Sequence, residues 1–209
     1  MDFNFSFIDF ILHLDQYLNA IINQLGLISY FVFWLVIFFE TGIVITPFLP
    51  GDSLLFGLGV MAGAGQLNII WLILGLTLAA ILGDSLNYAI GRFLGEKILA
   101  KNYRLINKKH IILTQEFFER HGNKTIVLAR FVPIVRTIAP FLAGLGRMNY
   151  RHFITYNIIG GILWVNLFLS AGYFLGSLPW VKNNFSLIII LIIIVFALPP
   201  FFIRSKKNQ

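Results

Sequence analysis

The stretch Val127–Gly144, "VLARFVPIVRTIAPFLAG", most constrains how this chain can fold, because it is apolar enough to enter a bilayer yet contains two arginines and two prolines. Each arginine at the centre of a membrane helix costs about +2.5 to +3.5 kcal/mol on insertion scales. On a straight helix Arg130 and Arg136 would point about 240° apart, so one sheltered crevice could not hold both. A continuous transmembrane helix is therefore unfavourable here, and a chain that breaks and turns back is favoured.

The composition indicates that this segment belongs to a membrane protein. Hydrophobic residues make up 58% of the 209 residues and charged residues only 12%, whereas soluble domains have about 45–50% and about 25%. The chain has no cysteine, which excludes disulfides, cysteine-ligated zinc and thiol catalysis. The length suits one membrane domain over residues 1–209. Bases begin at Arg92 and lie between hydrophobic segments, so the net charge of +7 reflects membrane orientation and not a nucleic-acid surface.

Three hydrophobic segments have the length and composition of ordinary transmembrane helices. They are Leu67 to about Tyr88, Phe153–Leu178 and Phe185–Ile203. The last covers roughly 28 Å at 1.5 Å per residue, which is enough to cross the hydrocarbon core. The stretch Ile8–Leu25 is amphipathic, and whether it crosses the membrane or lies on its surface stays open.

Two further apolar segments are predicted to be re-entrant hairpins. Ile28–Ala64 is too long for one span and is interrupted by "TPFLPGD", which favours a turn. Thr125–Gly146 is the segment with the two arginines, and a bend there needs protein or a watery cavity to cover its backbone. The residues predicted to shape the hairpins are Pro47, Pro50 and Gly51 in the first, and Pro133, Pro140 and Gly144 in the second.

Loop charge predicts the orientation of these segments. The stretch Arg92–Lys124 holds eight of the sixteen bases, so it is expected in the cytoplasm, as is the C-terminal "RSKK". Both can be cytoplasmic only if Thr125–Gly146 returns to the face from which it entered. The first hairpin, Ile28–Ala64, then enters from the opposite face.

Two short matches predict an internal repeat. "PFLPG" at 47–51 recurs as "PFLAG" at 140–144, and "IGRFLG" at 90–95 recurs as "AGYFLG" at 171–176. The predicted fold is therefore an all-α polytopic membrane protein with two inverted repeats, each made of an amphipathic helix, a re-entrant hairpin and a transmembrane helix. Repeat 1 covers about residues 8–95, repeat 2 about 110–178, and a C-terminal transmembrane helix follows at 185–203. Inverted repeats are typical of alternating-access transporters, whose substrate site lies at the midplane.

The hairpins carry the main candidate site residues. Glu40 and Asp52 come from the first hairpin, and Arg130 and Arg136 come from the second. Pairing of acids with bases is how buried charges survive in a membrane, and a purely structural salt-bridge cluster is the alternative to a binding site. Guanidinium groups match phosphate oxygens bidentately. The arginines are therefore candidates for anion binding, and Glu40 and Asp52 are candidates for proton coupling.

Asp84, Tyr88 and Arg92 form a secondary set of candidates within "GDSLNYAIGRFLG". They recur every four residues and share one helix face. Two interpretations stay open, a polar cap at the membrane end with a snorkelling Arg92 and a functional role. No metal-ligand spacing, nucleophile motif or nucleotide motif is recognisable, so a protein that is not an enzyme and needs no metal or cofactor is predicted.

Together these motifs resemble the DedA family, also called the SNARE-associated or VTT-domain family. The resemblance rests on Glu40 followed by "PFLPGD", on "GDSLNYAIGRFLG" and on "RFVPIVRTIAPFLAG", and it covers about residues 25–180. It implies two opposed re-entrant hairpins. It also implies that the essential acidic and basic residues of the family correspond to Glu40, Asp52, Arg130 and Arg136. Members of the family are implicated in lipid movement, including that of undecaprenyl phosphate, and in proton-motive-force homeostasis.

The functional prediction is a lipid-phosphate translocase of the bacterial inner membrane, linked to the proton motive force. Its partner would be the anionic head group of undecaprenyl phosphate or a related lipid. A proton-coupled exporter of small solutes or drugs is one alternative, and a phospholipid scramblase or a non-transporting membrane-homeostasis factor is another. The sequence leaves open which lipid or ion is involved and whether the chain forms a homo-oligomer.

Overall fold

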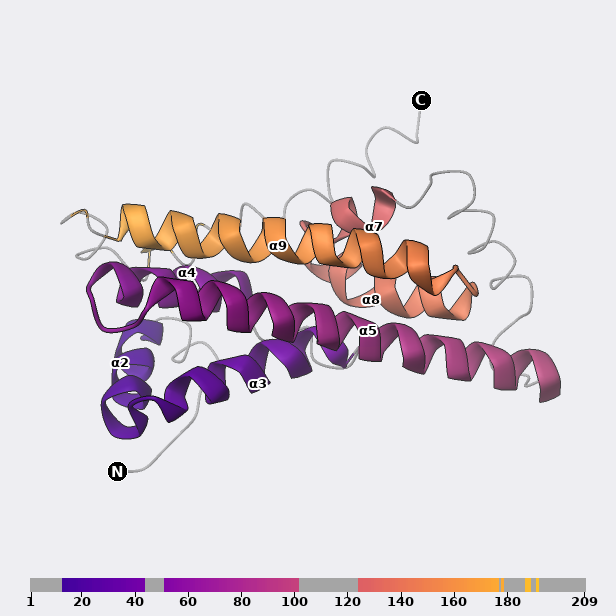
Figure 1. Ribbon diagram of the computed structural model, residues 1–209, viewed down its shortest axis with the longest axis horizontal. Coiled ribbons are helices and arrows are strands. Elements are labelled where there is room, and N and C mark those ends of the chain that lie inside the picture. The colour runs from indigo at the N-terminus through magenta and orange to yellow at the C-terminus, as the bar shows by residue number, and fades with distance from the viewer. Residues whose placement is uncertain are drawn as a thin grey trace. The chain divides into compact units, whose positions relative to one another are not determined.

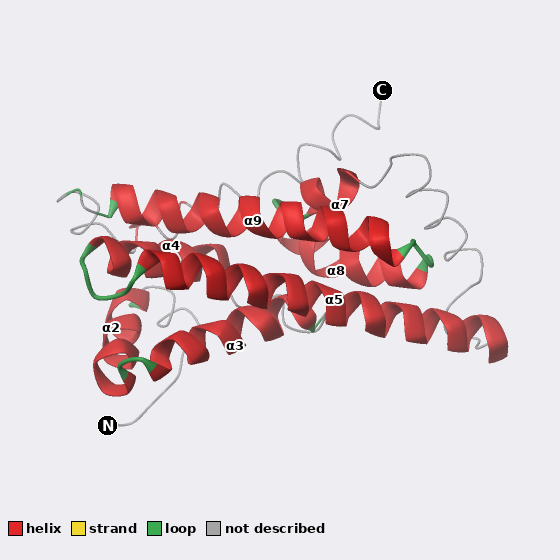
Figure 2. Cartoon of the chain, in the orientation of Figure 1, coloured by secondary structure: helices red, strands yellow, loops and turns green. Residues whose placement is uncertain are grey.

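The computed structural model describes residues 13–43, 51–101 and 124–176, together with residues 178, 187, 188 and 191. Every regular element within these ranges is a helix (Figure 2), so the all-α prediction is confirmed for them. The helices are α2 (Leu14–Leu25), α3 (Ile28–Gly42), α4 (Gly51–Gly63), α5 (Ile69–Lys101), α7 (Lys124–Ala129), α8 (Pro133–Leu145) and α9 (Tyr150–Leu175), labelled in Figure 1.

Two of these helices, α5 and α9, are long and apolar enough to cross a membrane. Their apolar parts are Ile69–Leu94 and Tyr150–Leu175, with 26 residues each, where about 20 suffice. They correspond to the predicted spans Leu67–Tyr88 and Phe153–Leu178. The predicted span at 185–203 lies outside the described residues, apart from three isolated positions.

The two segments that are predicted to be interrupted each contain two short helices. α3 and α4 have 15 and 13 residues, fewer than a spanning helix needs. The stretch between them, which holds Pro47 and Pro50, lies outside the described residues. In the second segment the helix breaks at residues 130–132, between the end of α7 and the start of α8.

The two prolines of the second segment have different roles. Pro133 is the first residue of α8, where its missing N–H removes no helical hydrogen bond. Pro140 lies inside α8, so the prediction that it shapes the bend is wrong. The missing N–H of Pro140 would have bonded to the carbonyl of Arg136, four residues earlier. Asn87 donates to the carbonyl oxygen of the next residue, Thr137, at 2.8 Å, and so supports the backbone of the same turn.

The glycines that are predicted at turns are helical. Gly51 is the first residue of α4 and Gly144 lies near the end of α8, and neither has a positive φ. Among the described glycines, those with a left-handed φ are Gly26 (53°), after α2, and Gly65 (80°), after α4. Since a side chain is strained at such angles, the need for glycine at a tight turn belongs to these two loops.

The chain divides into two compact units, whose boundaries fall within α3, α5 and α9. The first unit comprises residues 1–34, 50–75 and 165–209, and the second comprises 35–49 and 76–164. In the first unit α2 packs against α4. The amphipathic pattern predicted for the N-terminal stretch forms this helix, which buries one side chain every four residues: Leu14, Leu18 and Ile22.

Small residues let α4 and α9 approach closely in the first unit. Backbone atoms of Leu169 and Tyr173 lie where a Cβ on Gly59 would stand, and the carbonyl of Phe56 lies against Gly172 in the same way. Contact through small residues is how helices associate in lipid, where the hydrophobic effect does not drive them together. This contact explains why α4 is buried along most of its length.

The second unit shows the same kind of contact between α8 and the later part of α5, along which α8 lies (Figure 1). Gly144 lies against the carbonyl of Tyr88 and the amide of Arg92, and Gly91 lies against the carbonyl of Phe141. The contact brings α8, which carries Arg136, against α5. Gly144 therefore acts through close packing.

The α4–α9 contact and the α8–α5 contact place glycines in equivalent positions. Gly59 of α4 corresponds to Gly144 of α8, and Gly172 of α9 corresponds to Gly91 of α5. The second correspondence agrees with the match of "IGRFLG" with "AGYFLG". The first differs from the match of "PFLPG" with "PFLAG", which would pair Gly144 with Gly51, so the packing gives a shifted alignment in this part of the chain.

Candidate functional site

Arg136 and Glu40 form a buried ion pair in the second unit. Arg136 lies in the first turn of α8, and Glu40 lies near the C-terminal end of α3. Nη2 of Arg136 donates to Oε1 of Glu40 at 2.6 Å, and the two side chains are 5% and 1% exposed. An acid from the first interrupted segment thus meets an arginine from the second, as the sequence leads us to expect.

Arg130 forms a second buried ion pair, with Asp84 as its partner. Its Nη2 donates to Oδ2 of Asp84 and, at 2.9 Å, to Oδ1 of Asn157. Its Nη1 donates to the backbone carbonyl of Asn157 at 3.2 Å. Arg130 lies in the break between α7 and α8, while Asp84 lies in the middle of α5. The helix break therefore lies at Arg130, whose buried charge needs a partner.

Trp164 joins the two ion pairs into one site. Its indole is fully buried, and the guanidinium carbons of Arg130 and Arg136 lie 5.9 and 4.7 Å from the ring centroid. A cation within about 6 Å of an aromatic centroid is attracted by the ring, and more strongly when it is desolvated. Both arginines thus lie against Trp164, each with its own carboxylate partner, and we call Glu40, Asp84, Arg130 and Arg136 the charge cluster.

The charge cluster is electrically balanced when both carboxylates are ionised, because two acids accompany two bases. Balance matters because an unpaired buried ion costs several kcal/mol of desolvation, as an order-of-magnitude estimate. Oδ1 of Asp84 is buried and has no hydrogen-bond partner within the part of the chain that the structure describes. The cluster therefore holds an acceptor that a proton or a polar ligand could satisfy.

Asn87 forms hydrogen bonds with the backbone next to both residues of the Arg136–Glu40 ion pair. Its Nδ2 donates to the carbonyl oxygens of Thr41 at 3.1 Å and Thr137 at 2.8 Å. Thr41 follows Glu40 in the sequence and Thr137 follows Arg136. One buried amide thus holds α3 and α8 at the positions that bring this ion pair together, which makes Asn87 a positioning residue.

Asp52 is the predicted site residue that this description does not include. It lies buried in the first turn of α4, in the first unit, whereas the charge cluster belongs to the second. Its predicted place opposite the arginines stays a prediction. Asp84, a secondary candidate from the sequence, is the observed carboxylate partner of Arg130.

Tyr88 and Arg92 follow Asp84 on the same face of α5 but make other contacts. The buried Tyr88 hydroxyl donates to the carbonyl oxygen of Met148. Arg92 is exposed, and its Nη1 donates to the Tyr88 hydroxyl at 3.4 Å. Tyr88 therefore anchors the exposed Arg92 to the backbone at Met148, whereas Asp84 pairs with Arg130.

Asn157 and Trp164 are site residues that the sequence pattern does not predict. Asn157 offers a usable signal, because a polar residue inside an apolar span needs a hydrogen-bond partner when it is buried. Trp164 offers none, since one indole in an apolar helix is as consistent with packing against lipid or core as with binding a cation.

Comparison with known proteins agrees with the resemblance. The VTT domain model matches residues 49–174. Protein DedA of Escherichia coli (strain K12) is 50% identical over 212 residues, 99% of this chain and 97% of that protein. The uncharacterized membrane protein Rv0364 of Mycobacterium tuberculosis is 44% identical over 168 residues, 79% of this chain and 74% of that protein. The inner membrane protein YqjA of E. coli (strain K12) is 36% identical over 158 residues, 75% of this chain and 71% of that protein. No solved structure matches the chain.

The chain belongs to the DedA family of membrane proteins. The matched VTT domain contains Asp84, Arg130 and Arg136, while Glu40 precedes it. In this DedA-family protein, residues 13–43, 51–101 and 124–176 contain no group of three or more His, Cys, Asp or Glu side chains that could hold a metal ion.

We expect the coupling energies within the charge cluster to follow the observed pairs. Neutralising one member of a buried pair leaves the other charge uncompensated, which costs about 3–5 kcal/mol, whereas neutralising both removes that penalty. The Glu40→Gln/Arg136→Gln and Asp84→Asn/Arg130→Gln cycles should each give a coupling of about 1 kcal/mol or more. Thermal unfolding of the purified variants in detergent measures it.

The double variant Glu40→Gln/Arg130→Gln is the matched control for these cycles. It also removes one acid and one base, but the two residues come from different ion pairs. Its coupling should be clearly smaller than that of either observed pair. A cross coupling as large as the others would contradict the pairing.

Proposed function

We propose that this protein is a lipid-phosphate translocase of the bacterial inner membrane, which moves undecaprenyl phosphate or a related anionic lipid between leaflets. The proposal depends on one observation above all, the two buried arginines that share Trp164 in an apolar helical unit. Two guanidinium groups can hold one phosphate through bidentate, charge-assisted hydrogen bonds. The relative YqjA, named as an inner membrane protein, supports the location.

Exchange of partners would let the charge cluster bind and release a phosphate. Glu40 and Asp84 hold the arginines, and an incoming head group takes over guanidinium donors from at least one carboxylate. Because the two ion pairs are balanced in charge, the added negative charge favours protonation of the displaced carboxylate. Asp84 therefore joins Glu40 and Asp52 as a candidate for proton coupling. The lipid leaves with the same covalent bonds it brought, so the protein is not an enzyme in this proposal.

The interrupted helices provide the route in this proposal. The α3–α4 and α7–α8 pairs are re-entrant hairpins that enter from opposite faces, and the two repeats are inverted. The short apolar helices Ile28–Gly42, Gly51–Gly63 and Val135–Leu145 support hairpins, and the matching glycine contacts of α4 and α8 support a duplication. The head group passes between faces while the prenyl or acyl tail stays in the bilayer.

Transport in liposomes tests the proposal. Purified protein should move fluorescently labelled undecaprenyl phosphate between leaflets, and Arg136→Gln should slow it by about tenfold or more, because a charge-assisted phosphate contact is lost. Arg151→Gln is the matched control, since Arg151 is an exposed arginine at the start of α9, and its rate should stay unchanged.

Three outcomes would overturn this function. Labelled phosphatidylcholine moving as fast as undecaprenyl phosphate would indicate a scramblase. A soluble cation transported under a pH gradient, without lipid movement, would indicate an exporter. An Arg136→Gln variant as active as the unsubstituted protein would remove the phosphate-binding role.

Cysteine labelling tests the re-entrant topology, because the chain has no native cysteine. Lys124 and Arg151 are exposed residues that flank the second hairpin. Lys124→Cys and Arg151→Cys should react with a membrane-impermeant maleimide from the cytoplasmic side in oriented vesicles, and Lys182→Cys from the other side. Labelling of Lys124→Cys and Arg151→Cys from opposite sides would show a full crossing and contradict the inverted repeat.

A further inference from the structure

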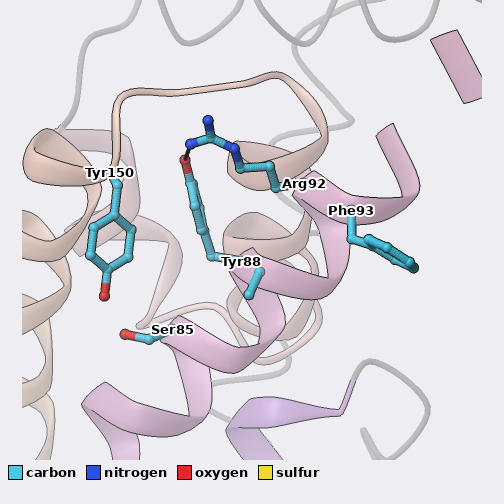
Figure 3. Close-up of a pocket in the computed structure, with 6 residues that line it drawn as sticks. Ser85, Tyr88, Arg92, Phe93 and Tyr150 are labelled. Carbon is cyan, nitrogen blue, oxygen red and sulfur yellow. Dashed lines mark hydrogen bonds between the residues drawn. The ribbon is translucent and has the colours of Figure 1, made fainter. Parts of the chain in front are cut away.

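An open cavity of about 400 Å³ lies on α5 in the second unit. Figure 3 shows its walls, which α5 and the first residue of α9 supply. The lining residues are Ser85, Tyr88, Ala89, Arg92, Phe93 and Tyr150. None of them belongs to the charge cluster, so the cavity is a separate feature of the same unit.

Arg92 supplies the positive charge of this cavity. The side chain is exposed, and Figure 3 shows its guanidinium next to the Tyr88 hydroxyl, to which Nη1 donates at 3.4 Å. Tyr88 is itself fixed, because it is buried, bonds to the Met148 carbonyl and stacks on Phe153 at a centroid distance of 4.5 Å. A fixed phenol thus anchors a guanidinium whose planar fork matches phosphate oxygens.

The surroundings of the cavity are suited to an amphiphile. Phe93, in its wall, is 57% exposed. On the adjoining face of α5 the exposed residues Leu82, Leu86 and Ile90 recur every four positions and form an apolar stripe. In a membrane this stripe faces lipid tails. A lipid whose tail lies along the stripe would bring its head group to Arg92, whereas a free anion would gain nothing from the stripe.

One side chain connects the cavity with the charge cluster. Nδ2 of Asn157 donates to Oγ of Ser85, in the cavity wall, at 3.4 Å. Oδ1 of the same Asn157 accepts from Arg130 at 2.9 Å. Along this chain of contacts, Ser85 and Asn157 lie between the cavity and the buried Arg130.

We infer that this cavity is a docking site for the phosphate head group of a lipid, with Arg92 as its receptor. The inference rests on the proposed function and adds an earlier step to it, in which the lipid is captured at Arg92 and then passed to Arg130 and Arg136. The concentration of bases in Arg92–Lys124 predicts that capture takes place from the cytoplasmic leaflet.

Thiol protection measures occupancy of the cavity. Ala89 is exposed in the cavity wall and the chain has no native cysteine, so Ala89→Cys in the full-length protein in nanodiscs reports on this site alone. Undecaprenyl phosphate should slow alkylation of this thiol, while undecaprenol, which has the same tail without a phosphate, should not.

Adding Arg92→Gln should raise the undecaprenyl phosphate concentration for half-protection by about tenfold or more. Adding Arg151→Gln should not change it, and adding Arg92→Lys, which keeps the charge without the fork, should raise it less than Arg92→Gln does.

Equal protection by undecaprenol or by inorganic phosphate would overturn the docking site, as would protection that does not depend on Arg92. The Arg136→Gln variant separates this inference from the proposed function, because it should retain protection and lose transport. Protection without any lipid movement would refute the translocase and keep the docking site. Transport that depends on Arg136 without protection would refute the docking site alone.

Discussion

A guanidinium group stays inside a membrane protein only if a counter-charge and hydrogen-bond acceptors meet it there. The second unit satisfies this requirement twice. Arg136 takes the carboxylate of Glu40 from the end of α3, and Arg130, in the break before α8, takes that of Asp84. The other features follow from bringing these groups together: α8 packs closely on α5 through glycines, and Trp164 covers both cations.

In the proposed mechanism the paired charges of this cluster exchange partners when a phosphate enters. Its balance of charge resists an incoming anion unless a carboxylate is displaced or protonated, which is a physical reason for linking phosphate movement to protons. The environment of Arg92 is different, because this exposed arginine lies beside an apolar stripe. In the inferred docking step a lipid phosphate is held there before it meets the buried pairs. Capture at the surface and exchange inside would then be separated along α5.

The sequence predicts the elements whose formation depends on local apolar length, and it predicts less well what depends on packing between helices. It identifies both long spans and the need for breaks near the arginines. It predicts Glu40 and Asp52 opposite the arginines and does not predict Asp84 as the partner of Arg130, because that pairing depends on how α5 lies against the break. Pro140 suggests a bend, but an amide from another helix stabilises the backbone around it. Gly144 suggests a turn, whereas its small size serves close packing, and a glycine in a sequence does not distinguish the two uses.

If a phosphate replaces a carboxylate in the charge cluster, its binding should be accompanied by proton uptake. Calorimetric titration with farnesyl phosphate, a short-chain analogue, in two buffers of different ionisation enthalpy measures that uptake at neutral pH. We expect uptake of about one proton per bound ligand, since a displaced carboxylate becomes neutral. The uptake should fall in Glu40→Gln or Asp84→Asn. Binding without proton uptake, or with the same uptake in both variants, would show that no carboxylate is displaced.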